Sequence, residues 1–283
     1  MRASVFLTIG SMNHDTTYVV DALPSPHSKV RALDHWAGPG GSAANTAYLL
    51  GRAGRAVRML GCVGEDAFGE VCLESLKGAG VDSFSVQKSK ARGTGLCTII
   101  LMNGDKRMIS AGGANEELCF GSVGSASLDG VDHIHVSSGS GEALTWAFRA
   151  ADAAGATVSL EWNGRDHRQF GRAGLNFMNA DELGRLTGSH SNLEAFSREL
   201  ADGLGGWVVV TNGVYGAWAT NGSGFASSPL PRRVDIVDRT GGGDAFDAGF
   251  LSGWKFGKSI EECLREGLLL AAEVLQVRGT RLK

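Results

Sequence analysis

The chain alternates short apolar segments with longer amphipathic ones, and this alternation constrains the fold more than any other feature. Apolar runs of strand length recur along it: VFLTIG (5–10), AVRMLGCVG (56–64), HIHVSS (133–138), ATVSLEW (156–162), GLNFMN (174–179) and GWVVVTNG (206–213). Segments with a helical pattern separate many of these runs: 42–54, 68–80, 142–155 and 192–206. Strands that alternate with helices predict an α/β fold with a mainly parallel central sheet, flanked by helices on both faces.

Two segments interrupt the alternation and predict a second, smaller sheet. Residues 94–113 hold two strand-like runs around an Asn-Gly dipeptide, which strongly favours a tight hairpin turn. Residues 16–37 are an extended mixture of polar and apolar residues that includes two prolines. We expect these segments to form a small β-sheet that stands off the main sheet as a lid. Nothing resembles a linker between domains, so residues 1–283 are predicted to form one domain with the lid inserted in its α/β core.

Charge and cysteine content exclude several classes of protein. The net charge of −3 offers no basic field, so neither nucleic acid nor a membrane is an expected partner. The five cysteines lack CxxC spacing and are odd in number, which indicates a reduced, cytoplasmic setting. The apolar run near the N-terminus is too short for a signal peptide, and no stretch reaches the length of a membrane span. The 42 glycines, spread without a fixed period, indicate many tight turns between strands and helices.

Polar loops follow the predicted strands, at the edge where a parallel sheet binds its ligands. The first strand is followed by GSMNHD, which carries Asn13 and Asp15, and GPGGSAAN at 38–45 precedes the first long helix. MNADE at 178–182 and TNGVYG at 211–216 follow two later strands. Because the carboxyl ends of parallel strands meet at one edge, these loops are expected to build a single site.

The segment DRTGGGD at 238–244 places three consecutive glycines directly before an apolar helical run. Such a turn exposes unpaired amides at the positive end of the helix dipole, where a transferring phosphoryl group would be stabilised. Asp244 follows at once and could accept a proton from an attacking hydroxyl. The alternative from these residues alone is a tight helix entry that Asp244 caps. The segment has no Walker lysine, and the glycines at 38–45 lack the spacing of a dinucleotide fingerprint.

Five segments, in order along the chain, resemble the ribokinase (PfkB-type) carbohydrate kinase family. GGSAANTAYLLGRAG (40–54) resembles its N-terminal signature, and DRTGGGDAFDAGFLSG (238–253) resembles its C-terminal signature. GSMNHD is similar to the sugar-binding strand end of ribokinases. NADELGRLTG (179–188) and VVVTNGVYGAWA (208–219) are similar to the family's N-x-x-E segment and nucleotide-facing strand. The resemblance implies a ribokinase-like fold and covers nearly the whole chain.

The resemblance also implies a role for each matching position. Asp244 would be the base that deprotonates the acceptor hydroxyl, and Glu182 would orient Mg²⁺ through water. The anion hole for the transferred phosphate would be formed by the amides of Gly241, Gly242 and Gly243. The acceptor would be held by Asn13, Asp15, Gly40, Gly41, Asn45 and Asp244. The nucleotide would be bound by Asn179, Thr211, Gly213, Gly216 and Arg165, and a monovalent cation such as K⁺ would lie near Asp238.

Several of these residues have simpler structural explanations. Glu182 is equally compatible with an acid in the first turn of a helix, stabilised by the helix dipole. Asp15 is compatible with a turn residue, and Arg165 with an exposed surface arginine. His133 and His135 point to one face of a strand, but no third ligand lies at a suitable spacing. We therefore expect the two histidines to pack in the sheet rather than to bind a metal.

The expected function is an ATP-dependent kinase for a primary hydroxyl of a small carbohydrate, either a ribose-like pentose or a hexose or keto-sugar. The alternatives are a nucleoside kinase of the same family and a catalytically weak protein that binds a sugar or nucleoside. Arg239 and Ser42 replace residues that are typical of ribokinases, so the sequence does not specify the sugar. The lid sheet is also a candidate surface for a homodimer.

Overall fold

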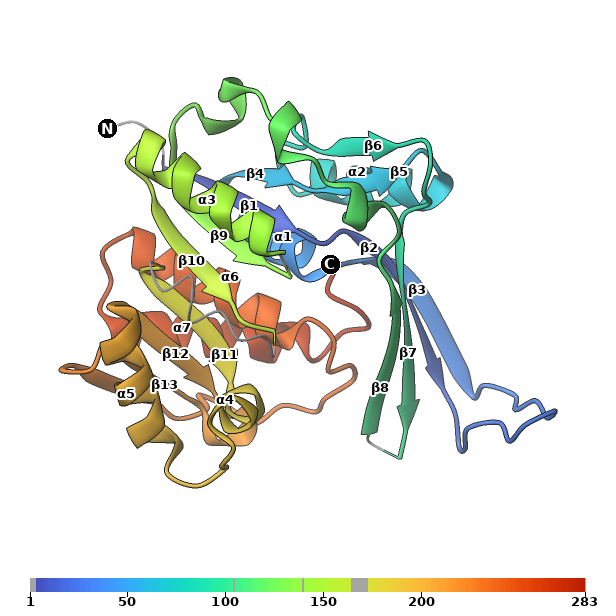
Figure 1. Ribbon diagram of the computed structural model, residues 1–283. Helices are drawn as coiled ribbons and strands as arrows, with labels where there is room; N and C mark the ends of the chain where they lie inside the picture. Colours follow the sequence, from blue (N-terminus) through green and yellow to red (C-terminus); the bar gives the residue numbers. More distant parts are fainter. Residues whose placement is uncertain (1–3, 104, 139, 164–172, 283) are drawn as a thin grey trace.

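The computed structural model describes residues 4–103, 105–138, 140–163 and 173–282 (Figure 1). Its main sheet has the strand order β14-β13-β12-β11-β10-β9-β1-β4. Neighbours from β12 to β4 run parallel, and β13 and β14 extend the sheet antiparallel at one edge. The strands are β1 Val5–Gly10, β4 Ala56–Leu60, β9 Val131–Ser137, β10 Thr157–Glu161, β11 Leu175–Asn179, β12 Trp207–Thr211, β13 Ala217–Thr220 and β14 Phe225–Ser228.

Helices cover both faces of this sheet, because successive residues of each buried strand point to opposite sides. In β1, Phe6 packs into the core beneath α1, α2, α6 and α7, and Leu7 packs into the core beneath α3, α4 and α5. The helices are α1 Ser42–Arg52, α2 Ala67–Gly78, α3 Gly141–Ala154, α4 Ala180–Thr187, α5 Leu193–Leu204, α6 Gly242–Lys255 and α7 Ile260–Val274. The predicted α/β class, with its mainly parallel sheet between helices, is confirmed.

A second sheet of four strands stands off the main sheet in the order β3-β2-β7-β8 (Figure 1). Its strands are β2 Asn13–Val19, β3 Asp34–Gly40, β7 Gly95–Met102 and β8 Asp105–Ala111. We call it the lid sheet. β7 and β8 pair antiparallel with Met102 opposite Asp105, which confirms the hairpin. β2 starts at Asn13, earlier than the expected segment 16–37, so the polar residues after β1 form the base of the lid sheet.

One predicted strand is wrong. The run at 56–64 is divided into β4 in the main sheet and β5 Cys62–Gly64, which pairs with β6 Gln87–Ser89 in a separate ribbon. The break falls at Gly61, where a Cβ would lie 2.9 Å from Sδ of Met12. The loop after β1 passes close to the chain at this point, because a Cβ would also lie 3.0 Å from the carbonyl oxygen of Gly10.

The residues after α7 return to the middle of the molecule. Figure 1 shows the C-terminus beside the base of the lid sheet, and Tyr48 Oη in α1 donates a hydrogen bond to the carbonyl of Leu282 at 3.1 Å. We call residues 275–282 the C-terminal tail. Across the part of the chain that the structure describes, no helix is long and apolar enough to cross a membrane.

Candidate active site

Asp244 lies in the first turn of α6, next to a bend that requires glycine. Gly241 precedes the helix with φ of 74°, in the left-handed region. A Cβ at Gly241 would also lie 1.9 Å from Cγ2 of Thr280 in the C-terminal tail. The bend leaves the amides of Gly242 and Gly243 at the N-terminus of the helix, where no carbonyl of the helix accepts from them.

The Asp244 carboxylate is buried and is held by α1. The residue is 7% exposed, and Nδ2 of Asn45 donates to its Oδ2 at 2.7 Å. Burial raises the pKa of Asp244 to about 6, while hydrogen bonds from Asn45 and Ser42 act in the opposite direction. The carboxylate is therefore mostly ionised at neutral pH and can accept a proton.

The space in front of the α6 N-terminus is open on the side of Gly243. A Cβ on Gly243 would meet nothing closer than Oε1 of Glu161, at 3.9 Å. A Cβ on Gly242, in contrast, would lie 3.1 Å from Leu275. The positive end of a 14-residue helix thus faces accessible space beside a base, which suits an anion that gains charge during reaction.

The residues predicted to hold the acceptor meet at the base of the lid sheet. A Cβ at Gly40 would lie 2.0 Å from Oδ2 of Asp15, and a Cβ at Gly41 would lie 2.5 Å from the carbonyl of Ser11. Glycine is therefore required for β2 and β3 to pack at this point. Burial and the charge of Asp244 raise the pKa of Asp15 to about 7, while Arg281 lowers it. Asp15, Gly40, Gly41, Asn45 and Asp244 thus form one contiguous region.

A cavity of about 210 Å³ opens against this region. Its walls come from the lid sheet, the loop before α6 and the C-terminal tail, and they include Asp15, Thr17, Trp36, Asp238, Thr240 and Arg281. Oδ1 of Asp15 and Oγ1 of Thr240 are buried and find no hydrogen-bond partner among the described residues. The cavity therefore presents polar atoms that a hydroxylated ligand could satisfy.

Asn13 holds the base of the lid sheet through a residue that the sequence did not single out. Its Oδ1 accepts from Nδ2 of Asn115 at 2.8 Å. Asn115 also accepts from the amide of Met12 at 2.8 Å and donates to the carbonyl of Gly112 at 2.9 Å. In this geometry Asn13 is engaged in the framework, and its contact with an acceptor stays a prediction.

Asp238 joins three parts of the chain and is 1% exposed. Its carboxylate accepts from Nε1 of Trp36 at 3.2 Å, from the amide of Gly279 at 3.0 Å and from the amide of Thr240 at 2.9 Å. Three N–H donors aimed at one carboxylate stabilise its negative charge. The predicted monovalent-cation role of Asp238 stays a prediction.

Asn179 and Glu182, predicted to act on Mg²⁺ and the nucleotide phosphates, cap α4 in this structure. Oδ1 of Asn179 accepts from the amide of Glu182 at 2.8 Å, and Oε2 of Glu182 accepts from the amide of Asn179 at 2.9 Å. This is a capping box, which satisfies two N–H groups at the helix start. Glu182 still lies within electrostatic reach of the site, because its charge raises the pKa of Glu161.

The other predicted nucleotide residues lie at the end of β12 and after it. Thr211 ends the strand opposite Ala217, and Gly213 follows with φ of 52°. Gly216 has φ of 91°, and a Cβ there would lie 2.2 Å from the carbonyl of Ser228. Arg165 lies outside the described residues.

A layer of acids and histidines lies beneath the site, and its acids were not predicted from the sequence. Glu161 accepts a short hydrogen bond from Ser137, and burial, together with the charge of Asp244, raises its pKa to about 8. Burial also raises the pKa of Asp247 well above its ordinary value. Nε2 of His135 lies 3.8 Å from Oδ2 of Asp247. The layer holds more protons at neutral pH than exposed carboxyl groups would.

His133 and His135 lie in β9 with serine and threonine as neighbours. Nδ1 of His133 is 2.7 Å from Thr157, and Ser159 lies 2.8 Å from a nitrogen of each ring. Within the described residues no cluster of three or more potential metal ligands was found.

Two tail residues form part of the site and were missed. Thr280 is 2% exposed and donates to Oδ1 of Asn45 at 2.8 Å, and Arg281 donates to the same oxygen at 2.8 Å. The only trace in the sequence is the group of three basic residues in VRGTRLK. Nothing local reveals that this segment returns to α1, because the contact spans almost the whole chain.

The buried carboxylate of Asp244 and the N-terminus of α6 face the same open space. This arrangement suits a phosphotransferase that acts on an alcohol. One group takes the hydroxyl proton, and the other stabilises the transferred phosphoryl group. The chain belongs to the pfkB family of carbohydrate kinases, whose family model matches residues 5–283. Members of this family are ATP-dependent phosphotransferases, and the predicted family and enzyme class are confirmed.

Relatives and solved structures agree with this assignment. The ATP-dependent ribose-1-phosphate kinase of Halopiger xanaduensis is 30% identical over 264 residues, which cover 91% of this chain and 87% of the relative. The cytidine kinase of Thermococcus kodakarensis is 41% identical over 113 residues, 38% of this chain and 39% of the relative. The structure of Arabidopsis thaliana ribokinase with ribose and ATP has a TM-score of 0.86 and 27% identity, and the match covers 99% of this chain and 94% of that one.

Proposed function

We propose that this kinase transfers the γ-phosphoryl group of ATP to the primary hydroxyl of a pentose-type acceptor, with Asp244 as the base. The observation that carries the proposal is the buried Asp244 carboxylate, held by Asn45 at 2.7 Å in the first turn of α6. The amides of Gly241, Gly242 and Gly243 form the anion hole next to it. Two relatives, the ribose-1-phosphate kinase of Halopiger xanaduensis and a ribokinase of Schizosaccharomyces pombe, support a pentose.

The size of the cavity supports a small acceptor. Sites for drug-sized ligands measure roughly 300–1,000 Å³, whereas this cavity measures about 210 Å³. A single sugar ring with one substituent suits that volume better than a nucleoside does. A nucleoside acceptor stays the second candidate because of the stretch shared with a cytidine kinase.

The reaction follows from the geometry as an in-line displacement. The primary hydroxyl of the acceptor gives its proton to the Asp244 carboxylate, and its oxygen forms a bond to the γ-phosphorus. The bond between that phosphorus and the oxygen shared with the β-phosphate breaks, so that the products are a phosphate monoester and ADP. The glycine amides stabilise the charge on the phosphoryl oxygens, and Asp244 releases the proton to solvent.

The nucleotide and its metal fit the residues on the other side of the α6 N-terminus. Asn179, Thr211, Gly213 and Gly216 are assigned to ATP, and Glu182 to Mg²⁺, whose oxygen preference its carboxylate meets. Mg²⁺ neutralises phosphate charge when bound. Potassium is not part of the proposal, because the Asp238 oxygens already accept three N–H bonds.

We assign to the lid sheet the role of keeping water away from the acceptor. Asp15 and Trp36 of this sheet line the cavity, so movement of the sheet would change access to it. The edge strand β8 is exposed along its whole length and is the surface assigned to the expected homodimer.

An ADP-release assay over D-ribose, α-D-ribose 1-phosphate, fructose and cytidine tests the proposal, with Asp244→Asn as the matched control. Loss of the base is expected to lower kcat by about 10²–10⁴-fold. In the wild type, kcat should rise with pH through about 6, because Asp244 must lose its proton first. Turnover of every compound at or below the Asp244→Asn rate would instead favour a binding protein without kinase activity.

A further inference from the structure

Arg281 places a cation at the wall of the acceptor cavity. Its guanidinium lies over the Tyr48 ring at 4.4 Å, and its Nε donates to Ser75 at 2.7 Å. Its Nη1 donates to Oδ1 of Asn45 at 2.8 Å. Since Asn45 is also the residue that holds Asp244, the cation is linked to the catalytic base through one side chain.

One nitrogen of Arg281 is left without a partner. Nη2 is shielded from solvent and finds no hydrogen-bond acceptor among the described residues. Asp15 and Thr240, which line the same cavity, also carry buried side-chain oxygens without partners. A buried donor left unpaired costs about 1–3 kcal/mol, and more when it is charged. A ligand in the cavity that accepts from Arg281 would remove this cost.

Two other charged residues around the cavity, Asp238 and Arg278, are already engaged. Asp238 accepts three N–H bonds, and Arg278 forms an ion pair with Asp34 at the rim. Burial lowers the pKa of Arg281 to about 10, so its guanidinium stays charged at neutral pH. Lys106 of β8 adds a second positive charge within reach, since it lowers the pKa of Asp15. An anionic group compensates a desolvated guanidinium better than a neutral hydroxyl does.

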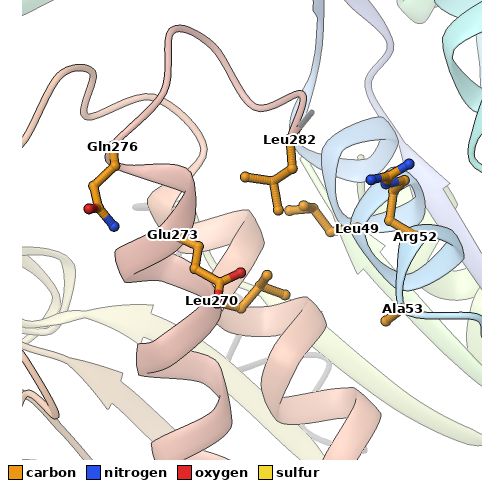
Figure 2. Close-up of a pocket in the computed structure, with 7 residues that line it drawn as sticks. All are labelled: Leu49, Arg52, Ala53, Leu270, Glu273, Gln276 and Leu282. Atoms are coloured by element: carbon orange, nitrogen blue, oxygen red, sulfur yellow. The ribbon is translucent and has the colours of Figure 1, made fainter.

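The tail has anchors that do not depend on Arg281. Figure 2 shows Leu282 between α1 and α7, with its side chain beside Leu49. Tyr48 bonds the carbonyl of Leu282 at 3.1 Å, and Asp238 accepts from the amide of Gly279 at 3.0 Å. The tail is therefore seated on both sides of Arg281 by contacts that do not involve the guanidinium, and Nη2 is the guanidinium nitrogen left without a partner among the described residues.

We propose that Arg281 determines specificity by binding a phosphate group that the acceptor carries on a carbon other than the one to be phosphorylated. The inference rests on the proposed function, because it names the substrate class of the same site. The planar guanidinium can offer Nη2 to such a group, and Asp15 can accept hydroxyls of the same molecule. The substrate class is a pentose phosphate, and the product is a bisphosphate.

The wild type alone provides the first test, with ADP release measured for α-D-ribose 1-phosphate and for D-ribose. The value of kcat/KM is expected to be about 10–100-fold higher for the phosphorylated sugar, the range for a charge-assisted hydrogen bond. The difference should appear mainly in KM. Use of ribose with equal or higher kcat/KM would overturn the proposal.

Variants assign the effect to Arg281. Arg281→Gln should lower the ratio of the two kcat/KM values by at least about tenfold, and Arg281→Lys should lower it less because the charge remains. Arg265→Gln removes an exposed arginine of α7 and is the matched control, with an unchanged ratio. An Arg281→Gln enzyme that is folded by circular dichroism and keeps the wild-type ratio contradicts the assignment.

Calorimetric titration without ATP separates this inference from the proposed function. The wild type should bind α-D-ribose 1-phosphate more tightly than ribose, whether or not it turns either sugar over. If no acceptor supports ADP release but this preference is present, the kinase proposal fails and the Arg281 site stands. If ribose and its phosphate bind equally while turnover is normal, the inference fails and the kinase proposal stands.

Discussion

The two sides of the α6 N-terminus are built in different ways. On the acceptor side, the contacts join residues far apart in sequence: Asn45 and Asp244 are 199 positions apart, and Asn45 and Arg281 are 236. On the proposed nucleotide side, Asn179 and Glu182 bond each other across three positions. The contacts on the acceptor side exist only in the folded protein, whereas the capping box of α4 forms within one helical turn.

This difference separates pre-organised groups from adaptable ones. Asp244, the proposed base, and its partner Asn45 are buried and fixed by the core, an arrangement that would hold reacting groups in position before substrate arrives. Asn179 and Glu182, which form the capping box of α4, are more exposed. Their side chains can exchange a backbone N–H for a ligand or a hydrated metal ion. Substitutions on the acceptor side should therefore have the larger effects.

Among the substitutions that compare the two sides, the largest effect is expected from a matched pair of glycine replacements. Gly40→Ala places a Cβ 2.0 Å from Oδ2 of Asp15, so the carboxylate must move. We expect kcat/KM for the acceptor to fall by about 10²-fold, the cost of a displacement near 1 Å. Gly213→Ala meets nothing within 4 Å and pays only for its left-handed φ of 52°. It should change kcat/KM for ATP by less than about tenfold.

Steady-state kinetics with each substrate varied in turn measures both effects. If Gly40→Ala lowered kcat/KM no more than Gly213→Ala does, the two sides would be equally tolerant of substitution, contrary to this expectation.

The next effect distinguishes a cap from a metal ligand. Glu182→Gln preserves the capping box, because glutamine can also accept from the Asn179 amide. It removes the charge that Mg²⁺ requires, so the concentration of Mg²⁺ that gives half-maximal activity should rise about tenfold. Titration of Mg²⁺ at saturating ATP measures this change. An unchanged Mg²⁺ titration would leave Glu182 with the capping role alone.

The smallest effect concerns the buried layer beneath both sides. The pKa of Glu161 is raised to about 8 in the fold, from 4.5. Between these values the folded protein binds a proton that the unfolded chain lacks, so the free energy of unfolding falls as the pH rises. Glu161→Gln has no proton to lose in this range, so it removes this fall in the free energy of unfolding. Its Tm advantage over the wild type should grow by at least about 3 °C from pH 5 to 9 in thermal melts. An advantage that does not change with pH would show that Glu161 is ionised in the fold.

The sequence was sufficient for the α/β fold class, whereas the roles of the motif residues stay predictions. The apolar runs gave the parallel sheet, and the Asn-Gly turn gave the hairpin of the lid sheet. The run at 56–64 misled because nothing local shows that Gly61 bends the chain away from the main sheet.

The site residues that were not predicted from the sequence were missed for one physical reason. Thr280, Arg281, Asn115 and Glu161 meet the site through contacts that depend on tertiary packing. A carboxylate such as Glu161 looks like any strand-end acid until burial raises its pKa. Sequence spacing can reveal a glycine-rich helix start, as at 241–243, but not side chains that come from the far end of the chain.

The central claim is that Asp244 takes the proton from the acceptor hydroxyl. Single-turnover transfer of labelled γ-phosphate to the acceptor the wild type uses best, at about pH 8, tests it most directly. Asp244→Asn is isosteric and can keep a contact with Asn45, so binding of both substrates should persist. We predict that its transfer rate is about 10²–10⁴-fold below that of the wild type. A variant that transfers phosphate within about threefold of the wild-type rate would contradict the account.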